Sequence, residues 1–162
     1  MIIDLNLNGE PRTAIIDIGD RLIDVLIHQF GLESLDMDCV SGHCGRCLVY
    51  LDGRLVYSCL VPAFKAKDSK VVTVEGLKAT DEFKDVEAGF FRSNLVTCGF
   101  CENAKKIAAF DLLNRNPLPS DLEILEQMDL ISCGCTDPQN MTDAVHAASE
   151  VRKHRKFNRE KA

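Results

Sequence analysis

The placement of its cysteines constrains this chain more than any other feature of the sequence. The eight cysteines fall into two groups of four, Cys39, Cys44, Cys47 and Cys59 in the first half and Cys98, Cys101, Cys133 and Cys135 in the second. Clustered cysteines form disulfides in secreted proteins, but in reduced compartments they more often bind metal or act in catalysis. The first residues lack the basic start and apolar core of a signal peptide. We therefore expect a cytoplasmic protein whose cysteines bind metal.

The first group has the spacing of a known cluster site. Four residues separate Cys39 from Cys44, two separate Cys44 from Cys47, and eleven separate Cys47 from Cys59. A Cys-x4-Cys-x2-Cys run followed by a distant fourth cysteine is the ligand pattern of a plant-type 2Fe-2S cluster. The spacing therefore predicts one 2Fe-2S cluster in the first half, with zinc as a much weaker alternative.

Two glycines lie inside this first cysteine loop. Gly42 and Gly45 permit a close backbone approach, and we expect them to help bind the cluster by bringing amide N–H groups to the sulfurs. Ser41, His43 and Arg46 share the loop. We expect these three side chains to be solvated, with contact to a redox partner as the alternative.

The second group predicts a site built from two separate segments. Cys98 and Cys101 are three apart at the expected start of a helix, where they would share a face near the positive end of the helix dipole. Cys133 and Cys135 are two apart and would point to the same side of an extended stretch. Four thiolates suit either a 2Fe-2S cluster or zinc, and the spacing of this group alone leaves both open.

Charge and hydropathy exclude two other classes of function. The formal net charge of −6 argues against a nucleic-acid partner, which requires a basic face. No apolar run reaches the roughly 18 residues that a membrane span needs. The sequence also lacks a nucleophile motif, a phosphate-binding loop and a Rossmann fingerprint, so we expect no catalytic residue on this chain.

The first half predicts a small mixed sheet with one helix. Asn8-Gly9 and Asp52-Gly53 are typical of tight hairpin turns. Apolar residues recur at helical spacing over 22–30, with Asp20 as the expected cap and Gly31 as the expected stop. The expected strands cover residues 3–7, 13–18, 48–51, 55–57 and 71–74.

The second half predicts helices and no strand. Ser120 and Glu123 form a capping-box pattern, and Asn140 or Thr142 could cap the last helix. The prolines in 116–119 should end the second helix. The expected helices cover residues 81–93, 98–114, 120–130 and 140–157. With a linker near 78–80, this pattern predicts two domains, 1–78 and 79–162.

Several motifs together resemble the small iron-sulfur subunit of the molybdenum hydroxylases, the family of xanthine dehydrogenase, aldehyde oxidoreductase and carbon monoxide dehydrogenase. These motifs lie at residues 39–59, 72–76, 98–101, 116–119 and 133–136 and cover nearly the whole chain in order. The resemblance implies an α+β chain with a ubiquitin-like β-grasp ferredoxin domain over 1–78 and a four-helix domain over 79–162, each holding one 2Fe-2S cluster.

The resemblance also implies a function and partners. A small subunit of this kind relays single electrons between the pterin of a large molybdopterin-binding subunit and an FAD-binding subunit, without catalytic residues of its own. The alternative from another class is a non-redox zinc-binding scaffold or metal-delivery protein that retains the fold.

The chain departs from the family pattern at several positions. Thr97 stands where the family usually has a Gln that helps hold the pterin, and Val40 stands where it commonly has Gly. Residues 102–104 replace a Thr-Pro-Gly sequence, and residues 133–138 replace Cys-Arg-Cys-Thr-Gly-Tyr. These changes gather around the second cysteine group, so we hypothesise a divergent member that serves an unusual large subunit.

Overall fold

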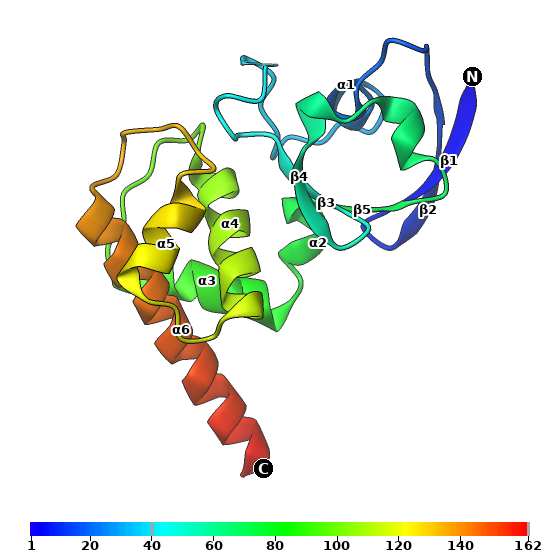
Figure 1. The fold of residues 1–162 in the computed structure, drawn as a ribbon. Helices are drawn as coiled ribbons and strands as arrows, with labels where there is room; N and C mark the ends of the chain where they lie inside the picture. The colour runs from blue at the N-terminus through cyan, green and yellow to red at the C-terminus, as the bar shows by residue number, and fades with distance from the viewer. Residues whose placement is uncertain (40, 162) are drawn as a thin grey trace. The chain divides into compact units, whose positions relative to one another are not determined.

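The computed structural model describes residues 1–39 and 41–161, so the replacement at Val40 lies outside the described residues. The chain divides into two compact units, Met1–Lys78 and Ala79–Ala162. The first contains a mixed sheet and the second contains helices (Figure 1). This combination confirms the expected α+β class.

A five-stranded sheet forms the centre of the first unit, in the strand order β2-β1-β5-β3-β4. Strand β1 pairs antiparallel with β2 and parallel with β5, and β3 pairs antiparallel with both β4 and β5. The five strands are β1 (Ile2–Leu7), β2 (Glu10–Ile15), β3 (Leu48–Leu51), β4 (Arg54–Tyr57) and β5 (Lys70–Val72). Two short 3-10 helices, η1 (Ser58–Leu60) and η2 (Ala63–Ala66), connect β4 to β5.

Both expected hairpin turns are present. Asn8 and Gly9 have φ values of 54° and 91°, and Asp52 and Gly53 have φ values of 48° and 80°. Two successive residues with positive φ are typical of the type I′ turn, whose twist matches that of the flanking strands. The turns therefore fix the registers of β1 with β2 and of β3 with β4.

Helix α1 (Leu22–His28) packs its apolar face on the sheet through Leu22, Val25 and Leu26. The expected cap at Asp20 is wrong. The helix begins after Arg21, whose backbone N–H donates to the Asp24 carboxylate at 3.0 Å. The Asp20 carboxylate instead accepts the N–H of Asp17 at 2.8 Å, because it closes the preceding turn.

Strand β5 is shorter than the sequence predicted, because the neighbouring strand β1 ends. Strand β1 turns back at Asn8, so the ladder with β5 stops at the pair Leu7–Val71. The Asn8 side chain then accepts the N–H of Thr73 at 2.8 Å, and the short helix α2 (Val74–Leu77) follows. Val74, expected in a strand, is helical.

Four helices make up the second unit, and its described residues contain no strand. The helices are α3 (Asp81–Arg92), α4 (Glu102–Arg115), α5 (Asp121–Met128) and α6 (Pro138–Glu160). Helix α6 extends well beyond the other three helices of its unit (Figure 1). The unit thus has the expected number of helices, in the expected order.

The starts of α4 and α6 differ from the prediction, whereas the predicted capping box at the start of α5 is confirmed. Helix α4 begins at Glu102 rather than at residue 98, and α6 begins at Pro138. The side chain of Asp137 caps α6, so neither Asn140 nor Thr142 has that role. The capping box at the start of α5 is present, with the Ser120 N–H donating to Glu123 at 2.8 Å.

The closest packing in the second unit joins α3 to α6. A Cβ atom at Gly89 of α3 would lie only 2.3 Å from the backbone nitrogen of Ala148 on α6, so this position admits no side chain. Near it, Asp85 is 3% exposed and accepts two hydrogen bonds from the Arg155 guanidinium, with the closest nitrogen at 2.8 Å. Arg152 is equally buried, and its Nε lies 3.5 Å from Asp85.

Among the described residues, no helix has both the length and the apolar character that crossing a bilayer requires.

Candidate metal centres

The four cysteines of the second group lie together. The Sγ of Cys98 is 3.1 Å from that of Cys101 and 3.6 Å from that of Cys133, and Cys101 and Cys135 are separated by 3.1 Å. All four sulfurs lie within 4.8 Å of one another. Within residues 1–39 and 41–161, no other group of three or more Cys, His or acidic side chains is gathered in this way around one metal position.

Two segments deliver these sulfurs. Cys98 and Cys101 lie in the turn before α4, where the Cys101 N–H donates to the Cys98 carbonyl at 3.3 Å and Cys101 is the N-cap residue. Cys133 and Cys135 lie in the turn between α5 and α6 rather than in an extended stretch. Convergence therefore depends on how the helices pack, because the packing sets where these two turns meet.

The surroundings shift the pKa values of these thiols in different directions. Burial raises the pKa of Cys101 above that of a free thiol. Burial acts in the same direction on Cys135, but bonds from the Thr136 hydroxyl and the Cys98 N–H outweigh it and lower the pKa of Cys135 to about 5. A thiolate is the form that binds metal. Cys135 is thus prepared for coordination near neutral pH.

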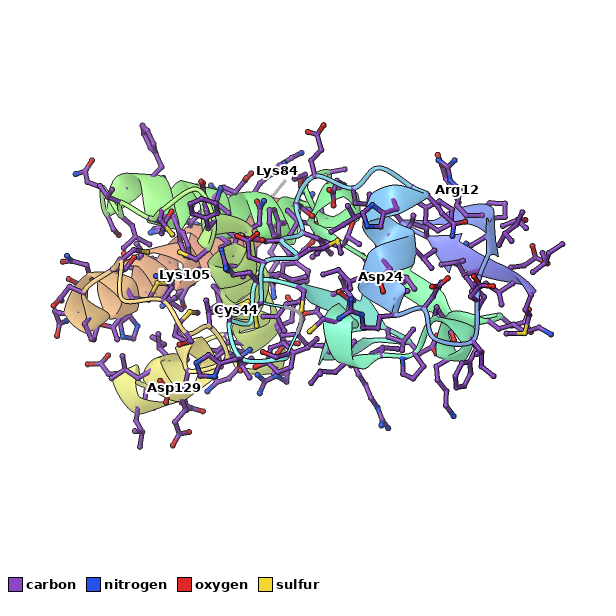
Figure 2. All side chains as sticks on the ribbon, turned by 90° about the horizontal axis from the view of Figure 1, so that it is seen from above. Arg12, Asp24, Cys44, Lys84, Lys105 and Asp129 are labelled. Atoms are coloured by element: carbon purple, nitrogen blue, oxygen red, sulfur yellow. The ribbon has the colours of Figure 1, made fainter. Side chains whose placement is uncertain are left out.

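A lysine that was not among the predicted site residues also reaches this site. Lys105 lies on α4 and is labelled in Figure 2; it is only 4% exposed. Its Nζ lies 3.3 Å from the Sγ of Cys135 and donates to the Thr136 hydroxyl at 2.9 Å. The signal was present in the sequence, because residues four apart on a helix share a face and Lys105 follows Cys101 by four.

The first group contains one pair of cysteines in the loop. The Cys44 N–H donates to the Sγ of Cys39 at 3.3 Å, and the Ser41 hydroxyl lies 3.2 Å from the same sulfur. The bond with Ser41, followed by backbone bonds, lowers the pKa of Cys39 to about 6. Cys44 is labelled in Figure 2. Bonds of this kind stabilise a thiolate in an otherwise open loop.

The other pair lies where the second hairpin ends. Leu48 pairs with Tyr57 across β3 and β4, so Cys47 and Cys59 lie just outside the last pair of the ladder. Both are buried, and both pack against Ile23 of α1. Burial raises the pKa of Cys47 to about 11.

The glycines of this loop have the conformation that glycine favours. Gly42 and Gly45 have φ values of 75° and 74°, where a side chain is strained. Arg46 is not a freely solvated side chain, because its guanidinium pairs with Asp36. Ser41 contacts Cys39, and His43 is exposed as expected.

The chemistry of both donor sets fits a metal centre. Each group offers four cysteine sulfurs, which is the ligand set of 2Fe-2S clusters and of tetrahedral zinc. In the second group an amide N–H and an ammonium group point at Cys135, and in the first an amide N–H points at Cys39. Donors of this kind offset the negative charge of thiolates.

Comparisons with known proteins agree with these observations. Residues 73–146, which include all four cysteines of the second group, match the family described as a 2Fe-2S binding domain. The chain is 36% identical over 148 residues to the nicotinate dehydrogenase small FeS subunit of Eubacterium barkeri, covering 91% of this chain and 94% of the relative. It is 33% identical to the nicotine 6-hydroxylase small subunit of Paenarthrobacter nicotinovorans, covering 88% and 86%.

A solved structure gives the same result. The crystal structure of quinoline 2-oxidoreductase from Pseudomonas putida 86 contains a chain that superposes with a TM-score of 0.84 at 33% identity, over 94% of this chain and 96% of that one. The similarity thus spans both units rather than the helical one alone. The chain belongs to the family of small 2Fe-2S subunits of the molybdenum hydroxylases.

Proposed function

We propose that the chain is the electron-transfer subunit of a molybdopterin-dependent hydroxylase or dehydrogenase and holds two 2Fe-2S clusters. The unit formed by residues 1–78 is then a plant-type ferredoxin domain of the β-grasp type, and residues 79–162 form the helical cluster domain. The observation that carries the proposal is the convergence of the four sulfurs of the second group, in a chain whose relatives are named as small subunits of oxidoreductases.

The arrangement of the first group supports a two-iron centre. A two-iron core takes two thiolates on each iron. Cys39 and Cys44 form one pair, joined by an amide N–H in the loop, and Cys47 and Cys59 form a second pair at the end of the hairpin. Gly42 and Gly45 allow the loop to curl around the core between the pairs.

Zinc is the alternative candidate for the second group. Sulfurs that all lie within 4.8 Å of one another can surround a single ion, since tetrahedral zinc takes four thiolates. The family match argues for iron, because it covers Cys98, Cys101, Cys133 and Cys135 together. We therefore assign the second cluster to these four residues.

Exposed apolar side chains beside the second group support a protein partner. Val96 is 80% exposed and Phe100 is 67% exposed, on either side of Cys98. Phe91 of α3 is 85% exposed as well, whereas Phe90 and Phe110 are buried. Exposed apolar patches often mark interfaces. We propose that this face docks on the large molybdopterin-binding subunit and that an FAD-binding subunit completes the assembly.

In this proposal the chain's own residues bind the clusters, orient them and shield them from water. When bound, the clusters supply one-electron redox chemistry. The loop amides and Lys105 place positive charge at the thiolates, and the burial of Cys47, Cys59 and Cys101 keeps water from them. No residue acts on substrate, so catalysis belongs to the partner subunits. We also propose a cytoplasmic location, because clustered cysteines in reducing compartments more often bind metal than form disulfides.

Purified protein tests the proposal directly. Aerobically prepared protein should be red-brown, bleach with dithionite and give two distinct EPR signals in the reduced state, one for each cluster. A colourless protein with stoichiometric zinc would support the scaffold or metal-delivery alternative. A single reduced-state EPR signal, with zinc bound at the second group, would support a cluster in residues 1–78 and contradict one in residues 79–162.

A further inference from the structure

Among residues 79–161, Lys105 is the one charged side chain that is buried against a candidate cluster ligand. It is 4% exposed, and a buried lysine is costly unless an anion or a hydrogen-bond acceptor compensates its charge. Among the described residues, its Nζ contacts the sulfur of Cys135 and the hydroxyl of Thr136, and no carboxylate forms an ion pair with it. The anionic group that Lys105 faces is therefore the cysteine site itself.

The position of the ammonium group is fixed from both ends. The backbone N–H of Lys105 donates to the carbonyl of Cys101 at 2.9 Å, which ties the residue to the first turn of α4. At the other end, the Thr136 hydroxyl accepts the Nζ proton at 2.9 Å, and its oxygen lies 3.3 Å from the carbonyl oxygen of Val96. This chain of contacts holds the charge 3.3 Å from the Cys135 sulfur rather than leaving it in solvent.

The neighbouring lysine shows what an ordinary placement looks like. Lys106 pairs with Glu102 at 2.7 Å and with Glu87 at 3.4 Å, so carboxylates already balance its charge. Lys105 differs because, in the part of the chain that the structure describes, it forms no ion pair with a carboxylate and its Nζ contacts a cluster ligand instead. Adding an electron to a site surrounded by thiolates increases its negative charge, and a fixed cation nearby lowers the free-energy cost of that step.

We infer that Lys105 is a positioning residue that raises the reduction potential of the centre held by Cys98, Cys101, Cys133 and Cys135. The inference rests on the proposed function, since it requires a redox cluster at that site. It assigns a different role from metal ligation: the lysine binds no iron and holds a positive charge at one ligand sulfur. Its effect should be confined to the second cluster.

The test is an EPR-monitored potentiometric titration of the full chain, with dithionite as reductant. Lys105→Met removes the charge and keeps a side chain of similar length. We expect the equilibrium constant for one-electron reduction of the second cluster to fall at least tenfold, which corresponds to a midpoint potential lower by about 59 mV. The first cluster serves as an internal reference and should not change.

Two further variants separate charge from shape. Lys106→Met removes the same net charge one position away and should leave both potentials close to those of the wild type. Lys105→Arg keeps the charge and should restore most of the potential lost in Lys105→Met. If Lys105→Met loses the second cluster altogether while Lys105→Arg retains it, the requirement for positive charge is also supported.

Three outcomes would overturn the inference. These are an unchanged second potential in Lys105→Met, an equal shift in Lys106→Met, or loss of the second cluster in Lys105→Arg as well. They differ from a failure of the proposed function, which would appear in the wild-type protein as the absence of a second reducible signal.

Discussion

The first cysteine group takes three of its four sulfurs from one loop of nine residues, whereas the second takes two from each of two segments about thirty residues apart. The first site therefore depends on local backbone geometry, with positive φ values at Gly42 and Gly45. The second depends on tertiary packing, because α4 and the turn before α6 must meet. A local site should survive damage to distant packing, whereas a site assembled by packing should not.

Removing a ligand should have the largest effect. We expect Cys101→Ser to abolish the second reduced-state EPR signal and to lower bound iron from about four to about two per chain. The free energy of unfolding of the helical unit should also fall, because metal binding contributes to its stability. Cys47→Ser is the matched change in the first unit and should abolish only the other signal. Loss of both signals in either variant would show that the two sites do not assemble independently.

The buried ion pair of α3 and α6 should come next. Asp85→Asn leaves Arg152 and Arg155 without their shared buried carboxylate, so we expect the free energy of unfolding to fall by about 3–5 kcal/mol. Urea unfolding measured by circular dichroism checks this, together with the intensity of the second cluster signal. Glu10→Gln removes the carboxylate that pairs with Arg12 on the surface, where both side chains are exposed, and should cost less than about 1 kcal/mol. Equal losses in the two variants would contradict the account.

The close contact between α3 and α6 gives a steric test. Gly89→Ala places a Cβ against the backbone of Ala148, and overpacking of this kind costs about 1–3 kcal/mol. The melting temperature of the helical unit should fall, with the second cluster released before the first. A Cβ atom at Gly19 in the first unit would meet no atom within 4 Å, so Gly19→Ala should leave the melting temperature and both clusters unchanged. A Gly89→Ala protein as stable as the wild type would show that the helices can separate freely.

A comparable change in the first unit involves Glu75. Its carboxylate accepts the N–H and hydroxyl of Ser34, at 3.0 and 2.7 Å, and the hydroxyl of Thr73, which holds the segment that leads into the cysteine loop. Glu75→Gln weakens these bonds, and we expect a loss of about 1–3 kcal/mol at neutral pH, seen in denaturant unfolding. The second cluster should be unaffected.

The same residue predicts a pH dependence. Burial opposes ionisation of Glu75, but the bonds from Thr73 and Ser34 outweigh it and hold the pKa of the folded carboxyl below its ordinary value. The stabilisation is therefore complete above the pKa of the unfolded chain and is lost as pH falls through the lower folded value. The difference between wild type and Glu75→Gln should shrink below about pH 4.5. A difference that grows on acidification would have the wrong sign.

The smallest expected effect is at the start of α5. Ser120→Ala removes the hydroxyl that accepts the N–H of Glu123, and loss of such a cap costs about 1 kcal/mol. Thermal unfolding should show a small decrease with both clusters retained. Loss of the second cluster would mean that α5 controls the Cys133–Cys135 turn more strongly than its cap implies.

The sequence was most informative where local chemistry decides the structure. Asn8-Gly9 and Asp52-Gly53 predicted their hairpins because only residues tolerant of positive φ suit a type I′ turn. Ser120 with Glu123 predicted the start of α5 for a similar reason. The spacing of the second cysteine group also predicted that its sulfurs would converge.

Predictions failed where an interaction depends on residues distant in sequence. Thr73 leaves the sheet because the neighbouring strand ends at Asn8, 65 residues earlier, and the Asn8 side chain accepts the Thr73 N–H. The contact of Lys105 with Cys135 joins residues 30 apart, so only the packed helices bring it into view.

Whether the chain holds two clusters can be decided by measuring iron and acid-labile sulfide on the intact chain prepared without oxygen. We expect about four iron atoms and about four sulfides per chain, because each group of four cysteines would hold one 2Fe-2S cluster. About two of each, with zinc making up the difference, would contradict a second cluster, and an absence of sulfide would contradict both.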